Sequence, residues 1–244
     1  MRSEIRYSSD LEGNRKENEL KEQKISEIEA SEKFFRKKES GKSESFSSKE
    51  LPSQKVAEIF HTNTKKAMIL EFGQNMTKEQ IERLKSNKTL EKVYVITSAD
   101  YVEKFPNVDF NVAGHCDTKD NIYVKDISAE IVKHVSVHET MHLCADREIT
   151  KAEDGTYKII SGLRETLDYA DGTCIDKNCG INEGATESYT LRKLYGWNEV
   201  KAAESIAAYS EARMWFERIE ELVGSERMSA AYFGKDKEGL MQEF

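Results

Sequence analysis

Long apolar runs are absent from this 244-residue chain. No stretch approaches the roughly 18 apolar residues that a membrane-spanning helix needs, and the first residues contain no apolar segment typical of a secretory signal peptide. We therefore expect a cytoplasmic protein, with leaderless secretion as the alternative. Apolar residues make up only 38% of the chain and charged residues 34%, which predicts that a sizeable part of it is unstructured.

Cysteine is scarce, and positive charge does not prevail. Four cysteines do not make the disulfide framework of a small secreted domain, and none of them has the Cys-x-x-Cys spacing of a zinc site. Cys174 and Cys179 are close enough in the chain to form a local disulfide, and two free thiols are the alternative. The net charge of −8 argues against nucleic acid and membrane surfaces as partners. The oligomeric state is not fixed by the sequence, and a monomer is the default.

Composition divides the chain near residue 50. Residues 1–50 hold ten Ser, twelve Lys or Arg and twelve Asp or Glu, with no Pro. Such a segment has too little apolar surface to fold alone, so we expect a disordered or partly helical leader. From Leu51 onward apolar residues recur with helix and strand periods, which predicts one folded domain over residues 51–244.

The folded part is predicted to mix short strands with helices. In chain order, the patterns predict a helix over 53–61, a strand over 66–72, a helix over 77–87, a strand over 92–98, a helix over 98–105, strands over 109–114 and 121–126, a long helix over 128–144, a strand over 156–163 followed by a loop to Gly180, and helices over 182–195, 199–223 and 225–232. Thr77 and Gln80 have the spacing of a capping box, and Pro106 ends the third helix. This order is typical of an α+β domain.

The long predicted helix carries His138, Glu139 and His142 in the spacing H-E-x-x-H. Positions i and i+4 lie one above the other on a helix, so both imidazoles can share one ion. Zinc accepts imidazole ligands and lowers the pKa of a bound water to about 7. Glu139, which projects beside that ion, could then take the proton of the water. Apolar residues around the motif predict a buried helix, where histidines need partners.

A catalytic zinc needs a third protein ligand, and the later segment I-N-E-G-A-T-E offers one. Glu183 and Glu187 are one helical turn apart and share a face of the next predicted helix. Glu183 is the candidate ligand, while Glu187 would accept a hydrogen bond from the outer nitrogen of a ligand histidine. Gly184 and Ala185 would let the two helices approach closely enough to share an ion. Without the upstream motif, the two acids would indicate only a charged helix start.

Together, H-E-T-M-H and N-E-G-A-T-E resemble the gluzincin branch of the zincin metallopeptidases, the group to which thermolysin belongs. The resemblance implies a zincin-like α+β domain with a small twisted mixed sheet, an antiparallel edge strand, an active-site helix and a helical C-terminal part. Carried over by position, it makes His138, His142 and Glu183 the ligands of Zn2+. It also makes Glu139 the general base and Glu187 the acid behind a ligand histidine.

Two other zincin branches can be compared with the same letters. A metzincin has a third histidine six residues after the second one, where this chain has Glu148, so that branch is excluded. An aspzincin uses G-T-x-x-D, and Gly172 to Asp176 fit this pattern. Asp176 is therefore the alternative third ligand. Glu183 is preferred because the segment around Asp176 has the composition of a loop.

Peptide hydrolysis also needs a donor for the oxyanion that forms on the scissile carbonyl. Gluzincins usually supply a Tyr or His from outside the two motifs, and the candidates here are Tyr189, Tyr209 and Tyr232. The sequence does not choose among them. His134, one turn before His138, is expected to be a packing or rim histidine rather than a ligand.

These features predict a zinc-dependent endopeptidase in which a zinc-bound water attacks the peptide bond, with Glu139 as general base. The partner would be a protein or peptide substrate in extended conformation, paired with an edge strand that we place at residues 121–126. The alternatives are a catalytically silent zincin-fold module that binds or regulates, and a structural zinc site closed by Asp176 or a cysteine. A secreted effector protease, exported through residues 1–50, is a further possibility.

Overall fold

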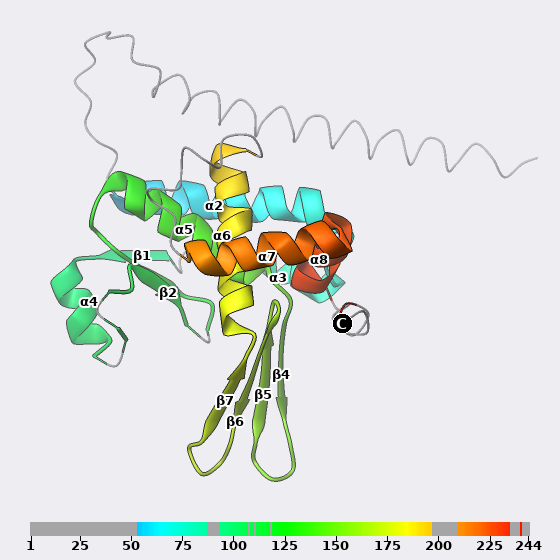
Figure 1. Ribbon diagram of the computed structural model, residues 1–244. Helices are drawn as coiled ribbons and strands as arrows, with labels where there is room; N and C mark the ends of the chain where they lie inside the picture. Colours follow the sequence, from blue (N-terminus) through cyan, green and yellow to red (C-terminus); the bar gives the residue numbers. More distant parts are fainter. Residues whose placement is uncertain are drawn as a thin grey trace, which may run out of the picture. The chain divides into compact units, whose positions relative to one another are not determined.

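The computed structural model describes residues 53–86, 93–106, 108–109, 111–117, 119–196, 209–234 and 240 (Figure 1). The predicted leader over residues 1–50 lies outside these ranges. In chain order the elements are α2 (Ser53–Phe72), α3 (Lys78–Lys85), β1 (Val93–Ile96), α4 (Ser98–Lys104), β2 (Gly114–Cys116), β3 (Ile122–Lys125), α5 (Ala129–Cys144), β4 (Arg147–Lys151), β5 (Tyr157–Ser161), β6 (Arg164–Asp168), β7 (Cys174–Lys177), α6 (Cys179–Tyr195), α7 (Ser210–Val223) and α8 (Ser225–Phe233). The chain is thus a mixed α+β protein. Among the described helices, none is both long and apolar enough to cross a membrane.

Helix α2 is continuous, so the predicted strand over residues 66–72 is wrong. Its buried residues include Ala57, His61 and Met68, which recur at helical spacing on the side that packs along α5. The apolar letters near Met68 suggested a strand because a short apolar run has the same appearance in a buried strand and in a buried helix. Only the tertiary contact with α5 distinguishes the two.

The capping box at the start of α3 is confirmed. The Thr77 hydroxyl accepts from the backbone N–H of Gln80 at 3.1 Å, and the Gln80 side chain accepts from the N–H of Thr77 at 3.3 Å. The Gln80 amide also donates to the carbonyls of Cys144 and Phe233. One capping residue therefore ties α3 to the ends of α5 and α8. The predicted elements β1 and α4 are also present.

The three-stranded sheet has the order β1-β3-β2, in which β3 runs parallel to β1 and antiparallel to β2. The segment 121–126, which we expected at the edge, is therefore the central strand, and all four residues of β3 are buried. The edge beside α5 belongs to β2, which within the described residues pairs with β3 alone. A central strand has no free backbone groups for a substrate, so the predicted pairing with residues 121–126 is wrong.

Strand β2 begins at Gly114, whereas the sequence predicted a strand over residues 109–114. Asp109 starts a turn instead: its side chain accepts from the N–H of Asn111, and its carbonyl accepts from that of Val112. Pairing begins only where Gly114 lies opposite Val124. The Val and Phe residues in this segment predicted a strand that begins before the observed one. Apolar periodicity does not reveal a turn that is made by a side-chain hydrogen bond.

The segment between α5 and α6 forms a four-stranded antiparallel sheet in the order β4-β5-β6-β7 (Figure 1). The sequence predicted β5 alone, followed by a loop to Gly180, so β4, β6 and β7 were missed. Strands β4 and β7 are almost wholly exposed and therefore lack the polar and apolar alternation of a half-buried strand. The two hairpin turns, Asp154–Thr156 and Asp171–Thr173, carry the same Asp-Gly-Thr letters, which is the signal that could have identified them.

The turn between β5 and β6 anchors this sheet to α6. The N–H of Leu163 donates to Asn182 Oδ1 at 2.9 Å, and the N–H of Gly162 donates to the carbonyl of Asp146 at 2.7 Å. Gly162 has a φ of 57°. A Cβ at this position would collide with Asn182 Oδ1 and would lie 2.8 Å from the Tyr232 ring. Only glycine fits here, next to the residue that precedes Glu183.

Helix α5 lies between two apolar clusters. One face packs on the three-stranded sheet and the start of α2, through a cluster that contains Val93, Ile122, Val124, Val132, Val135 and Leu143. The other face packs on α2, α6 and α8, through a cluster that contains Met68, Val137, Met141, Ala185, Phe216, Met228, Tyr232 and Phe233. Buried on both sides, α5 can hold its polar residues in fixed positions.

The C-terminal helices are close to those predicted. Helix α6 begins at Cys179, three residues before the predicted start, and α8 matches the predicted range within one residue. Of the predicted helix over 199–223, the part after Tyr209 is α7, while residues 199–208 lie outside the described ranges. Tyr209 itself has a φ of 57° and is the N-cap residue of α7.

The Gly162 turn makes a prediction about stability. In Gly162→Ala, the alanine would have to adopt the left-handed conformation, which costs a residue with a Cβ about 1–2 kcal/mol. Its Cβ would also displace Asn182 or Tyr232, which costs roughly 1–3 kcal/mol more. Gly172→Ala is a matched control, because Gly172 has a φ of 85° but no atom within 4 Å of the added Cβ. Urea unfolding should show the larger loss in Gly162→Ala, and equal losses would contradict the anchor.

Candidate metal centre

Helices α5 and α6 cross so that His138, His142 and Glu183 converge. The Nε2 atoms of His138 and His142 lie 3.4 and 3.2 Å from Glu183 Oε2. The two imidazole rings are 5.0 Å apart between centroids, and all three ligand atoms lie within 4.8 Å of one another. The structure therefore brings together the three residues that the sequence predicted as metal ligands.

The spacing of these donor atoms fits a tetrahedral ion. Zinc bonds of 2.0–2.1 Å to His and carboxylate ligands place neighbouring donors about 3.3 Å apart in a tetrahedron. The two separations from Glu183 Oε2 bracket this value. Two imidazoles and one carboxylate also form a ligand set of catalytic zinc, with one position left for water or substrate. By spacing and by chemistry, the residues present fit zinc.

The electrostatics of the site favour a cation. Burial would raise the pKa of Glu183, but hydrogen bonds from His138 and His142 hold it well below its usual value. Burial alone would lower the pKa of His138, and its hydrogen bonds to Glu183 and Glu187 raise that pKa to about 10. Negative charge thus dominates the contact between the two helices, and a dication would neutralise it.

Glu139 lies beside this group and next to the edge strand. It is 7% exposed. Burial raises its pKa, while the positive charges of His142 and His138 and a hydrogen bond from the backbone N–H of Cys116 lower it, and the net shift is upward. The carboxylate therefore lies between the ligand histidines and the backbone of β2, in the place that a base acting on a bound substrate needs.

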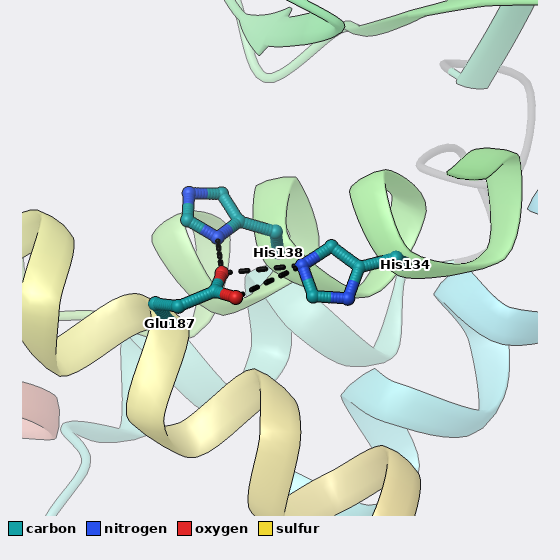
Figure 2. Close-up of side chains that lie close together, drawn as sticks. All are labelled: His134, His138 and Glu187. Carbon is teal, nitrogen blue, oxygen red and sulfur yellow. Dashed lines mark hydrogen bonds and ion pairs between the residues drawn. The ribbon is translucent and has the colours of Figure 1, made fainter. Parts of the chain in front are cut away.

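Glu187 lies behind the ligands, as predicted (Figure 2). It is fully buried, and its Oε2 accepts from His138 Nδ1 at 2.9 Å. If a metal replaced the proton on Nε2, this bond would keep the remaining proton of His138 on Nδ1 and its ring in the orientation that a ligand needs. Glu187 Oε2 also accepts from His134 Nε2 at 3.2 Å, while Oε1 lies 3.1 Å from the same nitrogen but has no hydrogen-bond partner among the described residues. The sequence predicted His134 only as a packing or rim residue and missed this contact.

Asp176, the alternative third ligand, lies away from the two histidines. It is exposed in β7, where its carboxylate accepts two hydrogen bonds from Arg164, at 2.9 and 2.5 Å. Among the described residues, the groups able to hold a metal include Glu183 and Glu187 but not Asp176. Cys174 is exposed, and neither Cys174 nor Cys179 is bonded to another sulfur in the structure.

The three candidate tyrosines have different surroundings. The Tyr209 ring stacks on the His138 ring, with centroids 5.7 Å apart and planes 19° from parallel, and Tyr209 remains 48% exposed. Burial and the charges of Glu183 and Glu139 raise the pKa of Tyr209 to about 12, so its hydroxyl keeps a proton to donate at neutral pH. Of the three tyrosines, Tyr209 is the one that stacks on a ligand ring and reaches solvent.

The other two tyrosines are buried. Tyr232 shares a hydrogen bond of 2.7 Å with Thr186 Oγ1, which lies 3.3 Å from His142 Nδ1. Thr186 and Tyr232 therefore hold the outer nitrogen of His142, as Glu187 holds that of His138. Tyr189 packs among aromatic rings, including Phe72 and Phe233, and contributes to the core.

Gly184 allows a close helix crossing, but not the one we expected. A Cβ on Gly184 would overlap the backbone carbonyl of Ala212 in α7. The glycine therefore admits α7 and not α5, and the prediction from sequence is corrected on this point. Because Ala212 is three residues after Tyr209, this crossing fixes the position of the tyrosine against His138.

The site joins residues from separate segments of the chain. The residues that could hold a metal lie on α5 and α6, with the β4–β7 sheet between them in sequence. The nearby Tyr209 comes from the start of α7. Comparison of the chain with protein-family models, with curated proteins and with solved structures gives no match.

Proposed function

We propose that this protein is a zinc metallopeptidase with a zincin-like domain of the gluzincin type. The observation that carries the proposal is the convergence of His138, His142 and Glu183 at separations suited to tetrahedral zinc. Glu139 beside the ligands and Glu187 behind His138 support it further. A purely structural site would have no use for Glu139 as a base.

The reaction is the addition of water across a peptide bond. When bound, zinc would supply a Lewis acid that lowers the pKa of water and polarises the scissile carbonyl. Glu139 accepts a proton from the attacking water as the new C–O bond forms. It then returns that proton to the amide nitrogen, so that the C–N bond breaks and the amine leaves neutral. Tyr209, stacked on His138, donates a hydrogen bond to the carbonyl oxygen while that oxygen carries negative charge.

The substrate would bind as an extended segment along β2. This strand is one of the two edges of the three-stranded sheet, and backbone groups of the other edge, β1, are bonded by the Gln54 side chain. The backbone N–H of Cys116 reaches the Glu139 carboxylate, so a peptide paired with β2 would pass beside the base. Pairing through backbone groups favours extended chains of many sequences. This placement supports the proposal that the protein is an endopeptidase acting on a protein or peptide substrate in extended conformation.

Substitution of the base separates chemistry from metal binding. Glu139→Gln should retain about one zinc per chain but lose roughly 100-fold or more of the hydrolysis rate, because the amide cannot accept the proton. His138→Ala should lose both zinc and activity. Zinc content and cleavage of a degenerate peptide library measure the two effects. Full activity in Glu139→Gln would overturn the mechanism, and zinc-bound wild type without turnover would indicate a binding module.

The third ligand can be tested by a pair of acidic variants. Glu183→Ala should weaken zinc binding by more than about 100-fold, equivalent to about 2.7 kcal/mol, because one of three protein ligands is lost. Asp176→Ala should leave the zinc affinity unchanged, since Asp176 binds Arg164 instead. Competition with a chromophoric chelator measures both affinities. The reverse order would assign the site to Asp176.

The role of Tyr209 predicts a selective kinetic defect. Tyr209→Phe keeps the ring against His138 but removes the hydroxyl, so kcat should fall about 100-fold while zinc affinity stays unchanged. Tyr189→Phe is the control, because this ring is buried in the core. Steady-state rates on one peptide substrate decide the matter, and equal kcat values for the two variants would contradict the assignment.

A further inference from the structure

His134 is a buried histidine that the proposed mechanism does not use. It is 5% exposed and precedes His138 by one helical turn, on the same face of α5. Figure 2 shows both histidines projecting from α5 toward the Glu187 carboxylate of α6. His134 Nε2 lies 3.1 and 3.2 Å from its two oxygens. The contact is therefore part of the wall behind the candidate metal ligands.

Glu187 depends on these histidines for its hydrogen bonds. Its carboxylate is fully buried, and a buried carboxylate must be compensated by donors. His138 Nδ1 supplies one, at 2.9 Å, and His134 Nε2 supplies the other. Without His134 the carboxylate would keep a single described donor and would be free to rotate about its last bonds. The orientation of His138 would then be held less firmly.

The surroundings of His134 also fix its tautomer. Its Nδ1 is buried and has no hydrogen-bond partner in the described part of the chain. A buried N–H without an acceptor costs about 1–3 kcal/mol, whereas the proton on Nε2 is bound by Glu187. His134 therefore carries its proton on Nε2, and His138, which bonds through Nδ1, carries its own on the other ring nitrogen. The two histidines donate to one carboxylate from opposite ring positions.

His134, His138 and Glu187 could also be read as a second set of metal ligands, since their donor atoms lie close together. The separations argue for hydrogen bonds instead. The 2.9 Å from His138 Nδ1 to Glu187 Oε2 is the length of an N–H···O bond between an imidazole and a carboxylate, and it is shorter than the about 3.3 Å between neighbouring ligands of tetrahedral zinc. Metals on both sides of His138 would also require its ring to give up both N–H protons, at further cost.

We propose that His134 is a positioning residue, which holds Glu187 so that Glu187 fixes the orientation and tautomer of the zinc ligand His138. The proposal rests on the zinc site proposed above. It extends that site by one hydrogen bond, into a chain that runs from the ion through His138 and Glu187 to His134. Partners behind a metal ligand typically change metal affinity or activity by 10- to 100-fold when removed. Because His134 acts on His138 only through Glu187, its removal should change zinc affinity by an amount near the lower end of this range.

Three variants of His134 separate positioning from packing. In His134→Gln, the side-chain amide can place an N–H where the imidazole has Nε2, so zinc affinity should stay within about threefold of wild type. In His134→Asn, the shorter amide reaches only the place of Nδ1, and zinc binding should weaken about tenfold. His134→Leu fills the space without a donor and should resemble His134→Asn. Chelator competition gives the affinities, and thermal unfolding of the metal-free forms compares their stability.

The tautomers provide a readout that a packing role would not change. In two-dimensional 15N–1H spectra of the imidazole rings, recorded on the zinc-loaded proteins, wild type should show His134 protonated on Nε2 and His138 on Nδ1. The His138 pattern should persist in His134→Gln and broaden or change in His134→Asn. Equal zinc affinities and an unchanged His138 pattern in His134→Asn and His134→Leu would overturn the proposal. Weakening in all three variants alike would also overturn it, because packing would then explain the effect.

The same measurements distinguish this inference from the proposed function. Wild type that binds zinc and cleaves peptides, with no effect of His134→Leu or His134→Asn, removes the role of His134 alone. Wild type that binds zinc without peptide cleavage, but with the predicted order of affinities, removes the peptidase and keeps the positioning role. Wild type that binds no zinc removes both.

Discussion

The burial of negative charge between α5 and α6 is the constraint on which the rest of the site depends. Glu187 is fully buried, and Glu139 is 7% exposed. Taking a single carboxylate out of water costs several kcal/mol unless donors or cations compensate. The compensation comes from histidines of α5, which bond to Glu183 and Glu187. In the proposed zinc-bound state both ligand imidazoles would be neutral, and the dication would supply the positive charge that balances the carboxylates.

The surrounding fold serves to hold this contact in place. Gln80 ties the end of α5 to α3 and α8, and Gly184 lets α7 cross α6 closely enough to seat Tyr209 on His138. On the other side, Thr186 and Tyr232 hold the outer nitrogen of His142. Each ligand histidine thus has its own support behind it, and rigid ligands lose less freedom when a metal binds.

Local spacing made the site predictable, whereas partners distant in sequence made much of the fold unpredictable. The i, i+4 pairs on α5 and α6 are set by helix geometry, so their letters predicted which side chains share a face. The central place of β3, the continuity of α2 at Met68 and the pairing of the exposed strand β7 depend on neighbours far along the chain. His134 was missed for the same reason. Its partner, Glu187, lies on the other helix, 53 residues further along the chain.

The β4–β7 sheet shows how the two motifs can be far apart in sequence and still meet. All four strands lie between His142 and Glu183, and the turn at Gly162 and Leu163 fixes them to Asn182. Because Asn182 is the neighbour of Glu183, this one contact sets where α6 begins relative to the end of α5. The inserted sheet accounts for the distance between the two motifs in sequence. The contact of the Gly162–Leu163 turn with Asn182 helps to hold the two motifs together in space.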